Sequence, residues 1–91
     1  MAGIPGDVRE QLLDELDRAR EQIRDGDADA ASATVRRIAG VASEEIAADD
    51  LAERLLHGCE EVEYHAADDP QVAVEYLRAM RDRVADGNES E

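Results

Sequence analysis

Four stretches with helical spacing of apolar residues constrain the fold of this chain more than any other feature. Within each stretch an apolar residue recurs every three or four positions, the period of a helix that buries one face. The spacing predicts helices over residues 8–24, 28–47, 51–67 and 70–85. The four apolar stripes comprise Val8, Leu12, Leu16, Ala19 and Ile23, then Ala28, Ala31, Val35, Ile38, Ala42 and Ile46, then Leu51, Leu55, Cys59, Val62 and Ala66, and finally Ala73, Tyr76, Leu77, Met80 and Val84. No strand pattern occurs, so we expect an all-α protein.

Acidic residues, glycine and proline mark the ends of these segments. Two pairs have the spacing of a capping box, Asp7 with Glu10 and Asp50 with Glu53. The segment 25–27 ends the first helix, and Asp69 is placed to cap the last one. Pro70 then suits the first helical position, where its missing N–H needs no partner. Gly40 falls inside the second helix and leaves the continuity of that helix open.

The two halves of the chain resemble each other. Residues 12–38 align with residues 55–80, so that each half forms a helical hairpin with a short acidic turn. We therefore predict an all-α, four-helix antiparallel bundle made of two helical hairpins over residues 7–86, between a flexible N-terminus (1–6) and a flexible acidic tail (87–91). The turns also resemble those of tetratricopeptide-type helix pairs, although the full 34-residue signature is missing.

The charge of the chain indicates its setting. The formal net charge is −14, all ten basic residues are Arg, and the 24 acids divide evenly between Asp and Glu. In about 1 M salt the Debye length falls to about 3 Å, so such a surface no longer destabilises the fold by self-repulsion. We interpret the charge as an adaptation to a salt-rich cytoplasm. A nucleic-acid mimic is less favoured because the acids are spread over every segment.

Several classes of function are disfavoured by the sequence. The N-terminus lacks a basic region followed by an apolar run, and no apolar stretch approaches the roughly 20 residues of a membrane span. Direct nucleic-acid binding is not expected, because it requires clustered cations and this acidic chain would repel the phosphate backbone. A single cysteine can form no internal disulfide. We therefore expect a cytoplasmic protein that needs no cofactor.

The segment HGCEEVEYH, residues 57–65, is the strongest candidate for a metal or catalytic site. His57, Glu61 and His65 recur every four residues along one ridge of the third helix. The ends of that ridge are about 12 Å apart, too far for one ion to take all three side chains. Cys59 falls on the apolar stripe, away from both histidines, so it is expected to be a buried apolar residue rather than a nucleophile. We predict a solvated ridge with His–Glu contacts, and keep a metal-binding or enzymatic bundle as the lesser alternative.

Two segments, LAERLLHGCEEVE (51–63) and QVAVEYLRAMRDRV (71–84), resemble the short, acidic, uncharacterised helical proteins of salt-loving archaea. The resemblance implies a cytoplasmic protein of a haloarchaeon with no assigned activity. It supplies no catalytic pattern, so no functional residues are transferred from it.

The predicted function is that of a small protein–protein interaction or scaffold module without catalytic activity. Large apolar residues that fall off the stripes predict a homodimer interface, and these are Leu13, Leu56, Val72 and Val74. Covering them would add apolar burial to a chain with only 18 Leu, Ile and Val residues. The alternative is a tetratricopeptide-like adaptor that binds a helix or tail of another protein in a groove between the hairpins.

Overall fold

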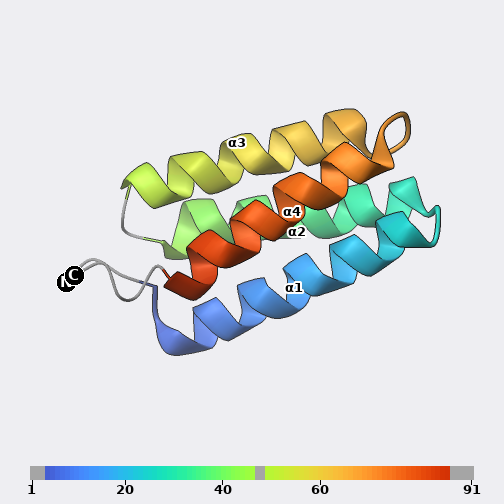
Figure 1. Cartoon of the computed structure of the whole chain (residues 1–91). Coiled ribbons are helices and arrows are strands. Elements are labelled where there is room, and N and C mark those ends of the chain that lie inside the picture. Colours follow the sequence, from blue (N-terminus) through green and yellow to red (C-terminus); the bar gives the residue numbers. More distant parts are fainter. Residues whose placement is uncertain (1–3, 47–48, 87–91) are drawn as a thin grey trace.

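The computed structural model describes residues 4–46 and 49–86, and it is an antiparallel four-helix bundle (Figure 1). The helices are α1 (Gly6–Arg24), α2 (Ala28–Glu45), α3 (Asp49–His65) and α4 (Pro70–Asp86). No strand occurs in these two described ranges, so the predicted fold class is confirmed. None of the four helices combines the length and the apolar character required to cross a membrane. The flexible ends predicted at 1–6 and 87–91 lie outside the described residues, apart from residues 4–6.

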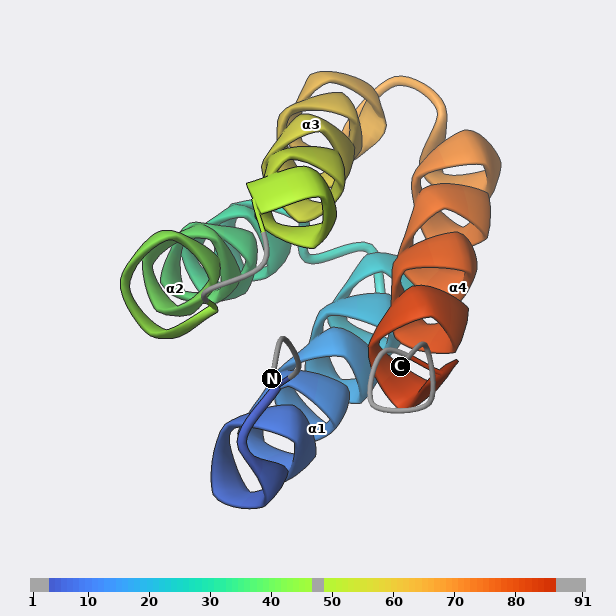
Figure 2. The ribbon, with the colours of Figure 1, turned by 90° about the vertical axis from the view of Figure 1, so that its left-hand side faces the viewer.

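The helices form a closed ring in which each packs against two neighbours. α1 contacts α2 and α4, and α3 likewise contacts α2 and α4. The view along the bundle shows α1 and α4 side by side, although they come from opposite ends of the chain (Figure 2). A tetratricopeptide-like stack would leave the first and last helices apart. The α1–α4 contact therefore makes this a bundle rather than an open superhelix.

Two helices begin two residues earlier than predicted. α1 begins at Gly6, with Pro5 in the N-cap position and no side-chain cap hydrogen bond. Asp7 is already helical, and its Oδ1 accepts a hydrogen bond from the N–H of the next residue, Val8, at 3.0 Å. The rigid extended backbone of Pro5 brings the chain into the helix earlier than a capping box would. Asp50 also lies inside its helix, because α3 begins at Asp49.

The turn between α1 and α2 has well-defined stop and start signals. Gly26 has φ of +82°, a conformation that favours glycine. Its N–H donates to the Ile23 carbonyl and the N–H of Asp27 donates to the Gln22 carbonyl, which is the Schellman motif. Asp27 then caps α2 by accepting a hydrogen bond from the N–H of Ala30 at 3.2 Å. The short turn therefore reverses the chain direction, so that α2 packs against α1 as a helical hairpin.

The other helix ends agree with the prediction or differ from it by one or two residues. α2 is continuous through Gly40 and ends at Glu45, because Ile46 adopts an extended backbone. Ile46 is nevertheless buried, as its place in the apolar stripe predicts. The start of α4 at Pro70 is as predicted.

The apolar core consists of the four predicted stripes together with Ile4. Every stripe residue is buried except Ala28, Leu51 and Tyr76, which are half-buried. Ile4 is also buried, so the ordered domain begins before the predicted residue 7. Thr34 is buried as well. Its hydroxyl is a donor within hydrogen-bond distance of two acceptors, Gln22 Oε1 at 2.8 Å and the Ala30 carbonyl at 3.1 Å. These contacts satisfy the only polar side chain among the buried residues described.

Candidate functional site

A groove of about 540 Å³ lies between the first half of α3 and the second half of α4. Antiparallel packing brings these two segments together. The groove is lined by Asp50, Glu53, Arg54, His57, Gly58, Tyr76, Ala79, Met80 and Arg83. We call it the α3–α4 groove. Its lining mixes charged side chains with small and apolar ones, which is the composition of a binding surface rather than of a core.

Gly58 and Met80 lie against each other in the groove. Gly58 is buried, and a Cβ built on it would lie 2.7 Å from Met80 Sδ and 2.8 Å from Met80 Cγ. The missing side chain therefore allows Met80 to reach across to α3. In the sequence, Gly58 stands out as a glycine inside an otherwise regular helical segment. The sequence alone does not show that Gly58 faces Met80.

The predicted ridge borders this groove. The Nε2 atoms of His57 and His65 lie 3.8 and 3.5 Å from the two carboxylate oxygens of Glu61, so the predicted His–Glu contacts are confirmed. The side chain of His57 is 66% exposed, whereas that of His65 is 24% exposed. His65 stacks on Tyr76 of α4 with ring centroids 6.1 Å apart. Within residues 4–46 and 49–86, no three His, Cys, Asp or Glu side chains are positioned to hold a metal ion.

Cys59 lies on the core side of α3 and is only 2% exposed, as its place in the stripe predicts. Burial raises the pKa of its thiol from 9.0 to about 12, with the carboxylates of Glu63 and Glu60 adding to the shift. At neutral pH the sulfur is therefore a protonated thiol enclosed by apolar residues. It has neither the thiolate character nor the exposure that a nucleophile requires.

The groove is lined by equal numbers of acidic residues and arginines. Asp50 and Glu53 contribute two acids, and Arg54 and Arg83 contribute two arginines. The whole chain has a net charge of −14, so a surface without net charge is unusual for this molecule. Tyr64, on the neighbouring ridge of α3, is 78% exposed and makes an edge contact with the ring of His65.

Ion pairs link the other three helix seams. Arg37 lies 3.5 Å from Glu15 between α2 and α1, Arg36 lies 3.5 Å from Glu63 between α2 and α3, and Arg81 lies 2.9 Å from Asp17 between α4 and α1. In the part of the chain that the structure describes, no ion pair crosses from α3 to α4. The charged side chains of the α3–α4 groove are therefore not paired across the seam.

The four predicted interface residues, Leu13, Leu56, Val72 and Val74, are all half-buried. Leu13 precedes Asp17 by one helical turn and so faces α4, while Val74 precedes Arg81 by two turns and faces α1. Leu56 shares the α2 side of α3 with Glu63. Val72 lies one turn before Tyr76, on the side of the groove. The four residues therefore occupy three different seams instead of one patch.

The fold and the groove define a small all-α bundle protein with a mixed-charge surface groove and a core built from short apolar side chains. The chain belongs to the family described as Domain of unknown function (DUF8101), which matches residues 1–86. Comparison with curated proteins and with solved structures gives no match. The family description agrees with the resemblance in one respect, that no function is assigned.

Proposed function

We propose that this protein is a protein–protein interaction module that pairs with a second copy of itself through the α3–α4 groove and the adjoining ridge of α3. The observation that carries the proposal is the charge balance of the groove. Two molecules with a net charge of −14 repel each other over most of their surfaces. The groove itself contains two acids and two arginines, so two copies can meet there without that repulsion. The ridge adds one acid, Glu61, whose carboxylate contacts His57 and His65.

Two-fold symmetry suits this distribution of charge. In a two-fold dimer the same surface is used twice, so the acids of one groove can approach the arginines of the other. The absence of an ion pair from α3 to α4 in the described ranges leaves these side chains available for such contacts.

Aromatic and apolar residues beside the groove supply contact area. Tyr64 is exposed, and Tyr76 and Val72 are half-buried on the groove side of α4. Tyrosine is enriched at protein interfaces because it offers a large apolar ring together with a polar hydroxyl. Of the four interface residues predicted from the sequence, Val72 belongs to this proposed interface. The other three lie at other helix seams, and their role in a dimer remains a prediction; these are Leu13, Leu56 and Val74.

The proposed setting is the salt-rich cytoplasm of a haloarchaeon. High salt reduces the repulsion between acidic molecules at distances beyond a few ångströms, while contacts in a closed interface are screened less. The excess of acids and the absence of lysine from the sequence support this setting.

The test is a matched pair of charge insertions at exposed alanines. Ala79 lines the groove, whereas Ala33 is exposed on α2. In about 2 M KCl we expect light scattering at micromolar concentrations to give a dimer for the wild type and for Ala33→Glu. The dissociation constant of the Ala79→Glu dimer should be at least about tenfold higher than that of the wild type. The reason is that the substitution gives each copy a third acid in the groove, so two additional negative charges face each other in the dimer.

A wild type that is monomeric throughout, or two variants that dissociate equally, would overturn this assignment. A strict monomer would favour a second candidate, in which the groove binds a helix of a different protein. This groove lies within the hairpin of α3 and α4, whereas the adaptor predicted from the sequence would bind its partner between the two hairpins. The second candidate is supported by the concave shape of the groove on a single chain.

A further inference from the structure

Three arginines gather on the seam between α1 and α4, away from the α3–α4 groove. A depression of about 270 Å³ there is lined by Asp17, Arg20, Arg78, Arg81 and Asp82. We call it the arginine depression. Nearly all of its lining is polar, and three arginines against two aspartates leave one net positive charge. This is unusual in a chain whose acids outnumber its bases by 24 to 10.

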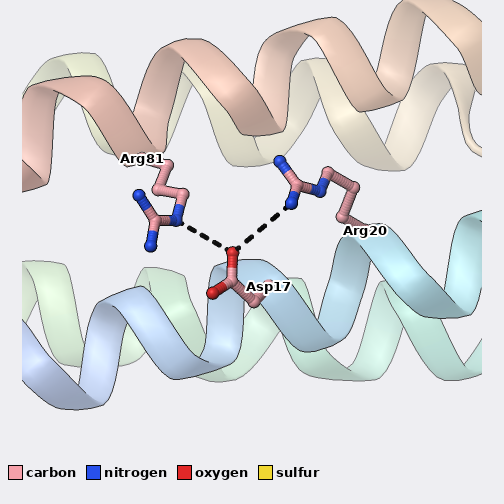
Figure 3. Close-up of polar contacts among 3 residues, drawn as sticks. All are labelled: Asp17, Arg20 and Arg81. Atoms are coloured by element: carbon pink, nitrogen blue, oxygen red, sulfur yellow. Dashed lines mark hydrogen bonds and ion pairs between the residues drawn. The ribbon is translucent and has the colours of Figure 1, made fainter.

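Asp17 lies between two of the guanidinium groups (Figure 3). Its Oδ1 accepts a hydrogen bond from Arg81 Nε at 2.9 Å and lies 3.9 Å from Arg20 Nη2. The pair with Arg81 uses only the Nε donor, which leaves both terminal nitrogens of that guanidinium outside this contact. The contact with Arg20 is too long for a hydrogen bond.

The remaining donors are in excess of the acceptors. Arg20 Nε is enclosed and has no hydrogen-bond partner. Arg78 is exposed and, among the described residues, takes part in no ion pair. Of the two carboxylates that line the depression, Asp17 contacts arginines from two helices, whereas Asp82 takes part in none of the ion pairs among the described residues. The two carboxylates therefore satisfy only part of the donors.

We propose that the arginine depression binds a phosphate group. Guanidinium groups present parallel N–H donors that match the oxygens of phosphate, and such charge-assisted pairs are stronger than neutral hydrogen bonds. Phosphate is favoured over a halide because it accepts several hydrogen bonds at once and carries up to two charges. It can thus compete with the Asp17 carboxylate for donors that the ion pair does not satisfy. The group could belong to a small phosphate ester or to a phosphorylated side chain.

The role of Asp17 gives this proposal a directional test. Asp17 is the internal competitor of the bound anion, so Asp17→Asn should bind inorganic phosphate more tightly. Arg78→Gln removes one guanidinium that has no partner in the described structure, and should bind phosphate about tenfold more weakly. Arg36→Gln is the matched control, since Arg36 is an exposed arginine on α2 outside the depression.

Titration of the full chain with inorganic phosphate, followed by calorimetry and by ³¹P NMR in about 1 M KCl, measures these affinities. We expect saturable binding of one phosphate per chain, weakened in Arg78→Gln, strengthened in Asp17→Asn and unchanged in Arg36→Gln. No saturable binding to the wild type would overturn the proposal. An equal loss in Arg78→Gln and Arg36→Gln would also overturn it, because it would indicate non-specific attraction.

A second pair of titrations identifies the source of the phosphate group. A phosphoserine peptide that binds more tightly than both inorganic phosphate and its unphosphorylated form indicates a phosphorylated protein. Equal binding of the phosphopeptide and inorganic phosphate indicates a small phosphate compound. Binding of the unphosphorylated peptide as tight as that of the phosphopeptide would contradict a phosphate site. Because the depression lies at the α1–α4 seam, its test is independent of the proposed dimer.

Discussion

Single residues determine how closely α3 approaches its neighbours. At Gly58 the absence of a side chain makes room for Met80, and this contact shapes the floor of the α3–α4 groove. The next residue along the chain, Cys59, points into the core instead. Adjacent residues of α3 thus serve different purposes, since Gly58 shapes a surface and Cys59 fills the interior.

We predict that the thiol of Cys59 is protected in the folded protein. Burial keeps it protonated, with its pKa raised to about 12, and shields it from reagents. At about pH 8 the native protein should react with a disulfide reagent on the order of 100-fold more slowly than the urea-unfolded chain. Comparable rates in the two states would mean that Cys59 is accessible in the folded protein.

The same shift in pKa predicts a dependence of stability on pH. Since the pKa is higher in the folded state than the ordinary value of 9.0, the contribution of the neutral thiol is fully present below pH 9.0. It is lost as the pH rises from 9.0 towards about 12. The free energy of unfolding, measured with urea, should therefore fall more steeply over this pH range for the wild type than for Cys59→Ala, which has no thiol to ionise.

At the scale of the helices, the sequence predicted which faces are buried more reliably than where helices begin or meet. The stripe of α1 is buried at every position, because a 3.6-residue period directly reports the core-facing side. The cap at Asp7 was wrong because Pro5 begins the helix by backbone geometry, which the capping-box spacing does not consider. Neither the α3–α4 groove nor the arginine depression was predicted. Both depend on side chains from two helices whose relative placement is a tertiary property.

Replacing two glycines by alanine should change the stability of the helices in opposite directions, because one glycine lies inside a helix and the other follows the end of one. Gly40 lies in the middle of α2, and a Cβ there would meet nothing within 4 Å. Gly40→Ala should raise the free energy of unfolding by about 0.5–1 kcal/mol. Gly26 has φ of +82°, so Gly26→Ala should lower it by about 1–2 kcal/mol. Urea unfolding followed by circular dichroism measures both, and changes of the same sign would contradict this account.

For the whole molecule, attraction and repulsion between charges respond to salt in opposite directions. The ion pairs of Arg36 with Glu63 and of Arg37 with Glu15 are at least partly exposed, and exposed pairs contribute little to stability. Salt weakens these few attractions, but it also weakens repulsion among an excess of 14 negative charges. The repulsion involves many more charge pairs, so its reduction should dominate.

We therefore predict that the melting temperature rises as KCl increases from about 0.1 to 2 M, where the Debye length falls from about 10 Å to below 3 Å. The same titration near the calculated isoelectric point of about 4.3 is the control. There the net charge approaches zero, so screening has little net repulsion to remove and the salt dependence should be much smaller. An equal rise at both pH values would indicate a general effect of salt on apolar burial. A flat or falling melting temperature at neutral pH would exclude the proposed adaptation to high salt.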